Sequence, residues 1–199
     1  MIHILYLAAG QSRRYGSNKL LADYGGKPLY RHGLDVLREA VSSRNDCTLN
    51  VVTCWEEISF SVTADGIRCI PCPDSHLGIS YTIRAGIAAV RPLNAEDYLL
   101  FAVADQPHLT SGTVTRLLDT AHLRPVTACL TCGEQSGNPV LFAASLADEL
   151  CTLEGDRGGK SVMRRHPENH IDVPCDPREL EDVDVREPQG ETFLKKVSP

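Results

Sequence analysis

The sequence predicts an α/β fold in which helices cover both faces of a mostly parallel sheet. Apolar runs of strand character alternate along the chain with runs of helical periodicity, and this alternation is typical of parallel strands joined by helical crossovers. Residues 98–104 are continuously apolar, as expected of a central strand that is buried on both faces. At 199 residues, without an internal repeat or a low-complexity linker, the chain suits one domain with a sizeable core. We therefore expect a single three-layer domain over residues 1–199.

Hydrophobic periodicity places the elements of the N-terminal half. Tyr30, Leu34, Leu37 and Val41 recur at helical spacing, so residues 29–41 predict an amphipathic helix. Short apolar runs, the second of them rich in β-branched residues, surround this helix and predict strands. The expected elements of this half are strands at 3–8, 49–54 and 67–71 and helices at 29–41 and 56–64.

The C-terminal half continues the alternation. Ile83, Ile87 and Val90 lie on one face of a predicted helix that opens among small polar residues. A polar tail follows the last helix and contains a strand-like segment at 182–185. The other expected elements of this half are strands at 98–104, 126–131 and 139–142 and helices at 78–90, 111–122, 146–153 and 160–165.

The composition excludes several classes of protein. Hydrophobic residues make up 42% and charged residues 23%, which is ordinary for a soluble globular protein. The net charge of −6 provides no basic field for nucleic acid, and no apolar run approaches the length of a membrane span. The chain enters its first strand directly after Met1, without the basic and long apolar segments of a signal peptide. We expect a cytoplasmic protein that binds neither nucleic acid nor membranes.

Eight cysteines are many for a chain of this length, and two pairs have the C-x-x-C spacing of zinc ligands. These pairs are Cys69 with Cys72 and Cys129 with Cys132. Both pairs lie in runs that predict strands, where side chains three residues apart point to opposite faces. We therefore expect buried, reduced cysteines, with a zinc or redox protein as the less favoured alternative.

The loop after the first strand has the composition of a polyphosphate site. The strand breaks at Gly10, and a small, polar, basic segment then runs to Lys19. Small residues let backbone N–H groups approach phosphate oxygens, Ser12 adds a hydroxyl donor, and Arg13, Arg14 and Lys19 add positive charge. The spacing is neither that of the Walker loop nor G-x-G-x-x-G. The loop favours a nucleotide triphosphate site over a basic surface turn.

The strand, loop and lysine together resemble the signature of the MobA-like nucleotidyltransferases, in the order LAAGQSRRYGSNK over residues 7–19. Tyr15 stands where the family usually has methionine. These enzymes join a nucleoside monophosphate to a phosphorylated acceptor and release pyrophosphate. The resemblance implies a Rossmann-like three-layer domain of the GT-A-like nucleotidyltransferase type. It implies nucleotide-binding roles for Leu7, Ala8, Ala9, Gly10, Ser12, Arg13 and Lys19.

A carboxylate follows the central strand, in the sequence Asp105-Gln106-Pro107. A carboxylate at the end of a buried strand is costly without a partner, and Mg²⁺ commonly takes one or two carboxylates together with phosphate oxygens. We favour Asp105 as a ligand of Mg²⁺, or of Mn²⁺, over a simple turn. The family carries a similar Asp-x-Pro at this place, and the form Asp-Gln-Pro resembles that of its cytidylyltransferase branch. Asp184 lies in a tail segment that resembles the family's Asp-Ile-Asp, and it is either a second metal ligand or part of a solvated acidic tail.

Residues 78–86 resemble the family segment Gly-x-Ser-x-Ser-x-Arg-x-Gly, with a threonine in place of the second serine. A helix that begins here presents free N–H groups and a positive dipole end, which suits a nucleotide. The resemblance implies nucleotide-binding roles for Ser80, Thr82 and Arg84. For Ser80 alone, an ordinary capped helix explains the pattern equally well.

Two glycine-rich segments, 137–142 and 155–160, resemble parts of the family that contact the acceptor. Asn138 stands where a histidine is expected, Gly159 where an alanine is expected and Lys160 where an arginine is expected. Lysine keeps the charge of arginine but loses its bidentate fork, so these departures leave the acceptor itself open. The resemblance implies acceptor-binding roles for Gln106, Pro107, Asn138, Asp156 and Lys160.

Together, these segments resemble the molybdenum cofactor cytidylyltransferase group of the family. That resemblance implies transfer of CMP from CTP to molybdopterin with release of pyrophosphate, with Arg13, Lys19 and Asp105 as the catalytic residues. Ala9 favours cytidine, since the guanylyltransferase group usually has glycine there. A molybdoenzyme of the xanthine dehydrogenase type would receive the product. The alternatives are GTP as donor, a sugar phosphate or methylerythritol phosphate as acceptor, and a non-catalytic carrier of the molybdenum cofactor.

Overall fold

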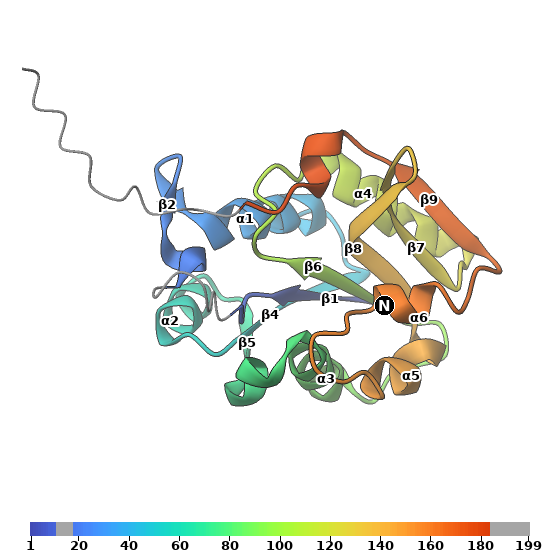
Figure 1. Cartoon of the computed structure of the whole chain (residues 1–199), viewed down its shortest axis with the longest axis horizontal. Helices are drawn as coiled ribbons and strands as arrows, with labels where there is room; N and C mark the ends of the chain where they lie inside the picture. The colour runs from blue at the N-terminus through green and yellow to red at the C-terminus, as the bar shows by residue number, and fades with distance from the viewer. Residues whose placement is uncertain (11–17, 184–199) are drawn as a thin grey trace, which may run out of the picture.

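A seven-stranded sheet forms the centre of the computed structural model, which describes residues 1–10 and 18–183 (Figure 1). Four of its six strand pairings are parallel, which confirms the predicted mostly parallel sheet. The strand β8 is antiparallel to both of its neighbours. The order of strands is β5 (Arg68–Pro71), β4 (Cys47–Thr53), β1 (Ile2–Leu7), β6 (Tyr98–Val103), β8 (Gln135–Ala143), β7 (Thr127–Cys132) and β9 (His170–Pro174).

Helices cover both faces of the sheet, as predicted. The helices α1 (Leu29–Val41), α2 (Glu56–Ala64) and α4 (Ser111–Asp119) pack on the face that carries Tyr6 of β1. The helices α3 (Ile79–Val90), α5 (Ala147–Cys151) and α6 (Lys160–Met163) pack on the face that carries Leu5. In Figure 1, α1 and α4 lie on one side of the sheet, and α3 and α5 lie on the other. Successive side chains of β1 thus pack alternately into two separate hydrophobic cores, one on each face of the sheet.

Short elements connect these layers. A two-stranded hairpin, β2 (Asp23–Tyr24) with β3 (Lys27–Pro28), leads into α1. The single-turn helices are η1 (Lys19–Leu21), η2 (Pro73–Leu77), η3 (Thr120–Leu123), η4 (Ala144–Leu146) and η5 (Pro177–Leu180).

The predicted helices at 29–41 and 56–64 match α1 and α2 in both bounds. The helix expected at 111–122 ends at Asp119 and continues as η3, and the helices expected at 146–153 and 160–165 are shorter than predicted. The prediction was wrong at two places in the C-terminal part. It missed β9, whose five residues end in a proline, because a short edge strand carries little periodic signal. It expected a strand at 182–185, but 182 and 183 have no regular structure and the rest lies outside the described residues.

The two cysteines of each C-x-x-C pair lie on opposite faces of the sheet, as predicted. Cys129 packs in the core under α5 and α6, whereas Cys132 packs against the other core. Cys72 and Cys69 divide in the same way. Because the two thiols of each pair lie on opposite faces of the sheet, neither C-x-x-C pair can chelate one ion with both thiols in this fold.

Among the residues that the structure describes, no helix combines the length and the apolar character that crossing a bilayer would need.

Candidate active site

A cavity of about 300 Å³ opens where β1 and β6 end. Leu7 and Val103 are the last residues of these neighbouring parallel strands, and both line the cavity. The residues that follow each strand complete this wall, with Ala9 and Gly10 after β1 and Asp105 after β6. Ligands of parallel α/β sheets bind at this edge, outside the carboxyl ends of the strands. The two loops singled out in the sequence therefore meet at one site.

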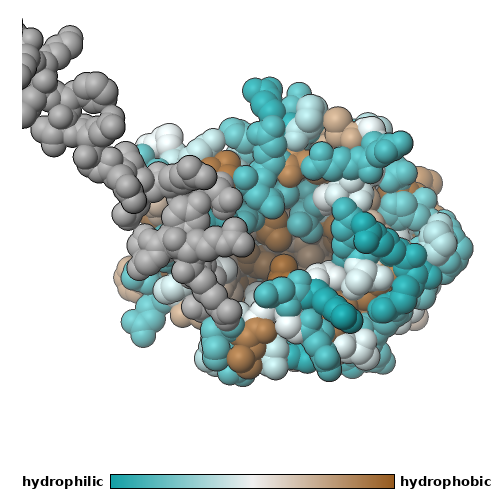
Figure 2. Space-filling view, viewed as in Figure 1, coloured by the Kyte–Doolittle hydropathy of each residue, from teal (hydrophilic) through white to brown (hydrophobic). Residues whose placement is uncertain are grey.

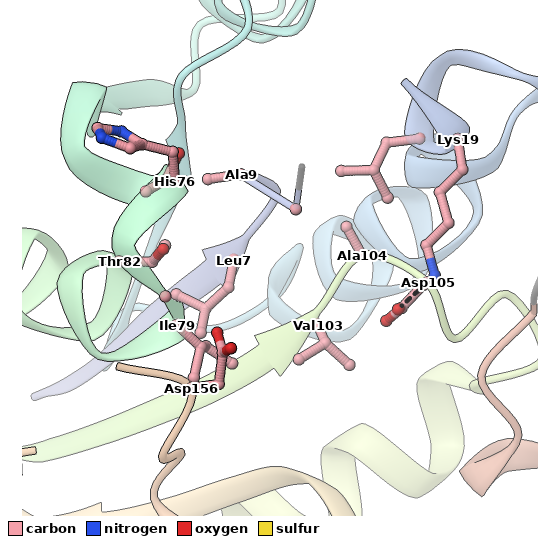
Figure 3. Close-up of a pocket in the computed structure, with 14 residues that line it drawn as sticks. Leu7, Ala9, Lys19, His76, Ile79, Thr82, Val103, Ala104, Asp105 and Asp156 are labelled. Carbon is pink, nitrogen blue, oxygen red and sulfur yellow. Dashed lines mark hydrogen bonds and ion pairs between the residues drawn. The ribbon is translucent and has the colours of Figure 1, made fainter. Parts of the chain in front are cut away.

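Lys19 and Asp105 form an ion pair on one wall of this cavity. The Nζ atom of Lys19 donates to Oδ2 of Asp105 at 3.0 Å, and the side chains are 14% and 26% exposed. Figure 3 shows the lysine reaching down from η1 toward the aspartate at the end of β6. Asn18 holds η1 in place, because its side chain accepts a hydrogen bond from the N–H of Leu20 at 3.0 Å. Two predicted catalytic residues, 86 positions apart, are thus brought into contact.

The opposite wall of the cavity comes from α3 and the loop at 155–156. Gly78 precedes α3 with φ at +125°, and a Cβ atom at this position would lie 2.3 Å from the carbonyl carbon and oxygen of Gly155. Ser80 then donates its backbone N–H to that carbonyl at 3.1 Å. This close approach places Asp156 on the wall of the cavity that Thr82 of α3 also lines (Figure 3). A glycine is required at Gly78 for both its backbone angle and its contact.

The predicted nucleotide-binding residues divide into two groups. Leu7, Ala9, Gly10, Lys19 and Thr82 line the cavity. Ala8 is buried and donates its N–H to the carbonyl of Val52. Ser80 is buried too, and its hydroxyl has no hydrogen-bond partner among the described residues. Arg84 lies over the ring of Tyr81, 4.1 Å from its centroid, and points to the carbonyl of Leu153, outside the cavity.

A second cavity of about 300 Å³ adjoins the first and shares Leu7, Ile79 and Val103 with it. Gln106, Asn138 and Lys160, all predicted to bind the acceptor, line this second cavity. Pro107 is buried and lines neither cavity, and Asp156 belongs to the first. Figure 2 shows a hollow near the middle of this face, with an apolar floor and a hydrophilic rim. The geometry therefore offers two adjoining compartments, which an enzyme that joins two substrates requires.

The C-terminal tail is anchored beside Asp105 by a contact that the sequence analysis missed. Glu179 is only 4% exposed, and its carboxylate accepts hydrogen bonds from the N–H and hydroxyl of Thr110 and from the hydroxyl of Thr113. Four residues later, Val183 donates its N–H to the carbonyl of Asp105 at 2.9 Å. The pattern Asp176-x-x-Glu179 indicates a capping box, but it gives no sign of this tertiary contact.

His76 and Ser75 also line the first cavity, and the sequence analysis missed both. His76 belongs to η2, and its Nδ1 lies 3.1 Å from the carbonyl oxygen of Pro73. Ser12, Arg13 and Asp184 lie outside the described residues, so their predicted roles remain predictions.

The site suits a metal ion that takes most of its ligands from the substrate. Asp105 and Asp156 are the carboxylates that line the first cavity. In the described part of the chain, no trio of ligating His, Cys, Asp or Glu side chains gathers at this cavity. Mg²⁺ and Mn²⁺ prefer oxygen ligands, and Mg²⁺ is often bound by one or two carboxylates and substrate phosphates. The donor set fits such an ion.

Comparison with known proteins assigns the family. Residues 4–170 match the family described as the MobA-like NTP transferase domain. The chain belongs to this family. The purine catabolism protein PucB of Bacillus subtilis is 27% identical over 195 residues, which cover 92% of this chain and 91% of PucB. The molybdenum cofactor guanylyltransferase of Shewanella putrefaciens is 27% identical over 161 residues, which cover 78% and 77% of the two chains.

Solved structures share the fold. A nucleotidyl transferase from Methanothermobacter thermautotroptrophicus superimposes with a TM-score of 0.72 at 19% identity, covering 92% of this chain and 91% of its own. The manganese complex of Rv0371C from Mycobacterium tuberculosis superimposes with a TM-score of 0.66 at 22% identity and covers 88% of each chain. The predicted family, fold and enzyme class are thereby confirmed: this MobA-like protein is a nucleotidyltransferase.

Proposed function

We propose that this nucleotidyltransferase transfers CMP from CTP to molybdopterin and releases pyrophosphate. The observation that carries the proposal is the contact between Lys19 and Asp105 at the shared end of β1 and β6, beside a second compartment lined by Gln106, Asn138 and Lys160. The cytidine preference rests on Ala9, whose methyl group narrows the first cavity, and on the Asp-Gln-Pro sequence that follows β6.

In this proposal, the first cavity holds CTP and the second holds the acceptor. A terminal phosphate of molybdopterin attacks the α-phosphorus of CTP, a bond to that phosphorus forms, and the bond to the pyrophosphate oxygen breaks. The attacking phosphate is already an anion, so the reaction needs no strong general base. Positioning and charge neutralisation then account for most of the rate, as in other phosphoryl transfers.

The chain's own residues divide this work. Lys19, with Arg13, binds the triphosphate, and the ammonium group leaves Asp105 for the phosphate oxygens when CTP enters. Asp105, with Asp184 as a second proposed ligand, would hold Mg²⁺ or Mn²⁺, which when bound neutralises charge on the phosphates. The N–H of Val183 bonds the carbonyl of Asp105, which supports this pairing because the next residue in the chain is Asp184.

Lys160 is the proposed contact for the acceptor phosphate. Lys160 lines the second cavity, and its ammonium group donates to the carbonyl of Ser136, another lining residue, at 3.1 Å. Gln106 is oriented by two acceptors, the carboxylate of Asp182 at 3.0 Å and the carbonyl of Leu180 at 3.4 Å. Asn138 on β8 completes this polar group. Pro107 and Asp156 are the remaining proposed contacts of the acceptor.

A second candidate is transfer of GMP from GTP to the same acceptor. It is favoured by the relative named a molybdenum cofactor guanylyltransferase.

In either case we propose a single domain over residues 1–199 that acts in the cytoplasm. We propose that it transfers its product to a molybdoenzyme of the xanthine dehydrogenase type.

The test is pyrophosphate release with Mg²⁺, comparing CTP, GTP, ATP and UTP, each with and without molybdopterin. Release with CTP alone, and only in the presence of molybdopterin, supports the proposal. Release with GTP alone moves the protein to the second candidate. Binding of CTP without release of pyrophosphate, with a correctly folded protein, contradicts the proposed reaction. It favours either a different phosphorylated acceptor or a carrier of the cofactor.

A further inference from the structure

The edge of the sheet that is farthest from β5 carries a cluster of three potential metal ligands. Cys129 lies on β7, and His170 and Asp172 lie on the neighbouring parallel strand β9 (Figure 1). In the register of these strands, Cys129 is the partner of Asp172 and Thr127 is the partner of His170. Side chains two residues apart point to the same face of a sheet, so all of these side chains project from one face. None of them lines either cavity of the active site.

The ligating atoms of this cluster converge on one point. The Sγ atom of Cys129 lies 3.7 Å from Nε2 of His170, and this nitrogen lies 3.3 Å from Oδ1 of Asp172. All three ligand atoms lie within 4.8 Å of one another. With Zn–S of about 2.3 Å, Zn–N of about 2.0 Å and Zn–O of about 2.1 Å, a tetrahedral ion separates S from N by about 3.5 Å and N from O by about 3.3 Å. The observed separations match these values.

An ion pair between the histidine and the aspartate explains this geometry less well. A good N–H···O hydrogen bond is about 2.7–3.2 Å long, and the 3.3 Å between Nε2 of His170 and Oδ1 of Asp172 is slightly longer than that. A protonated Nε2 also carries a single hydrogen, which can point at one of its two neighbours only. A metal ion between the three atoms satisfies all of them at once.

Thr127 orients the imidazole for this role. Its hydroxyl lies 2.7 Å from Nδ1 of His170, and Thr127 itself is fully buried. A histidine that binds a metal through one ring nitrogen usually bonds a neighbouring group through the other, which sets the direction of the ligating lone pair. The hydroxyl of Thr127 leaves Nε2 aimed at Cys129 and Asp172.

We propose that Cys129, His170 and Asp172 bind one Zn²⁺ ion, with a water molecule in the fourth position. Thiolate, imidazole and carboxylate are the ligands of zinc sites, and three protein ligands with one open position form a known class of them. The carboxylate of Asp172 is 66% exposed and the imidazole 20%, so the ion enters from solvent. The bound ion ties the edge strand β9 to β7.

Binding exchanges the thiol proton for the metal. Burial raises the pKa of the Cys129 thiol to about 11, so the thiol keeps its proton in the absence of the ion. When the Zn–S bond forms, the S–H bond breaks, and the proton leaves to solvent. No change of oxidation state is involved.

The test is a titration of the metal-stripped, full-length protein with Co²⁺, a spectroscopic substitute for Zn²⁺. We expect a thiolate-to-cobalt charge-transfer band that saturates at one equivalent and disappears when Zn²⁺ is added. A metal held by Asp105 has oxygen ligands and gives no such band, so the result is independent of the proposed nucleotidyl transfer.

The variants isolate the ligands. Cys129→Ser removes the band, whereas Cys132→Ser, on the same strand but the opposite face, keeps it. Asp172→Asn, at an exposed position that does not endanger folding, weakens Zn²⁺ binding at least about tenfold, and Thr127→Val weakens it about 10- to 100-fold. Zn²⁺ raises the unfolding midpoint of the wild type more than that of Asp172→Asn.

Two outcomes would overturn the proposal. The first is the absence of any charge-transfer band at one equivalent of Co²⁺ in the wild type. The second is a band that survives in folded Cys129→Ser, which would assign the thiolate to another cysteine.

Discussion

Replacement of Gly78 by alanine tests the contact that builds one wall of the active site. Gly78 has φ of +125° and ψ of 168°, a region essentially restricted to glycine, and a side chain there costs about 1–3 kcal/mol. The added Cβ would also lie 2.3 Å from the backbone carbonyl of Gly155, and relieving such overpacking costs about another 1–3 kcal/mol. The free energy of unfolding should therefore fall by about 2–6 kcal/mol, which lowers the melting temperature of a domain this size by about 5–20 °C.

Alanine substitutions at two other glycines separate the conformational cost of Gly78→Ala from its steric cost. Gly66 has φ of +74°, and no atom lies within 4 Å of the position that a Cβ would take there, so Gly66→Ala pays the conformational cost of about 1–2 kcal/mol without a clash. Gly112 lies in α4 with open space and no positive φ, so Gly112→Ala should raise the stability by about 0.5–1 kcal/mol. The assay is thermal and denaturant unfolding of the three variants beside the wild type.

The function of the same variants gives a second measurement. Moving Gly155 away from α3 also moves Asp156 off the wall of the first cavity, so Gly78→Ala should lose nucleotide affinity at temperatures where it is folded. Gly66→Ala should bind nucleotide like the wild type. Equal unfolding midpoints for Gly78→Ala and Gly66→Ala would refute the reasoning, because they would mean that the contact with Gly155 is not close.

Three further predictions concern catalysis, the tail and pH. Lys19→Ala and Asp105→Ala should each lower the rate of pyrophosphate release at least about 100-fold without loss of fold, and unchanged turnover in either variant would contradict the role of that residue. Glu179→Gln should lower the free energy of unfolding, measured in denaturant titrations, by about 1.5–3 kcal/mol. It should also slow catalysis, because it loosens the tail beside Asp105. A variant with unchanged stability and activity would contradict the proposal that Glu179 anchors the tail. Hydrogen bonding to Glu149 raises the pKa of His166 above its ordinary 6.5. The protonated imidazole therefore stabilises the folded state fully below pH 6.5, and this stabilisation is lost as the pH rises through the raised pKa of the folded state. His166→Gln should therefore lower the unfolding midpoint more at about pH 5.5 than at about pH 8.5, and an equal effect at both would contradict the pairing.

The helices at 29–41 and 56–64 could be predicted in full because their signals are local. The spacing of Tyr30, Leu34 and Leu37 already defines the face that α1 buries, and all three side chains are buried in the structure. The loop from Leu7 to Lys19 could be linked to a family for the same reason, since its residues follow one another in the chain. The strand β9 could not be predicted, because an edge strand of five residues is stabilised by its partner β7.

The active site shows the same division between local and distant information. Lys19 and Asp105 were each identified from their own loops. Nothing in the sequence indicates that Nζ of Lys19 and Oδ2 of Asp105 lie 3.0 Å apart. Arg84 shows the reverse: it follows a recognisable pattern, but its helix directs it toward Tyr81 and Leu153, outside the cavity.

By itself, the sequence determined the fold class, most of the elements and the family of this protein, because periodicity and contiguous motifs are properties of neighbouring residues. The tertiary structure alone decided which distant residues meet. It joined the ends of β1 and β6, brought the tail to Asp105 through Glu179, and placed Cys129 beside His170 and Asp172. These contacts depend on the pairing and register of strands, which arise from the packing of the whole chain.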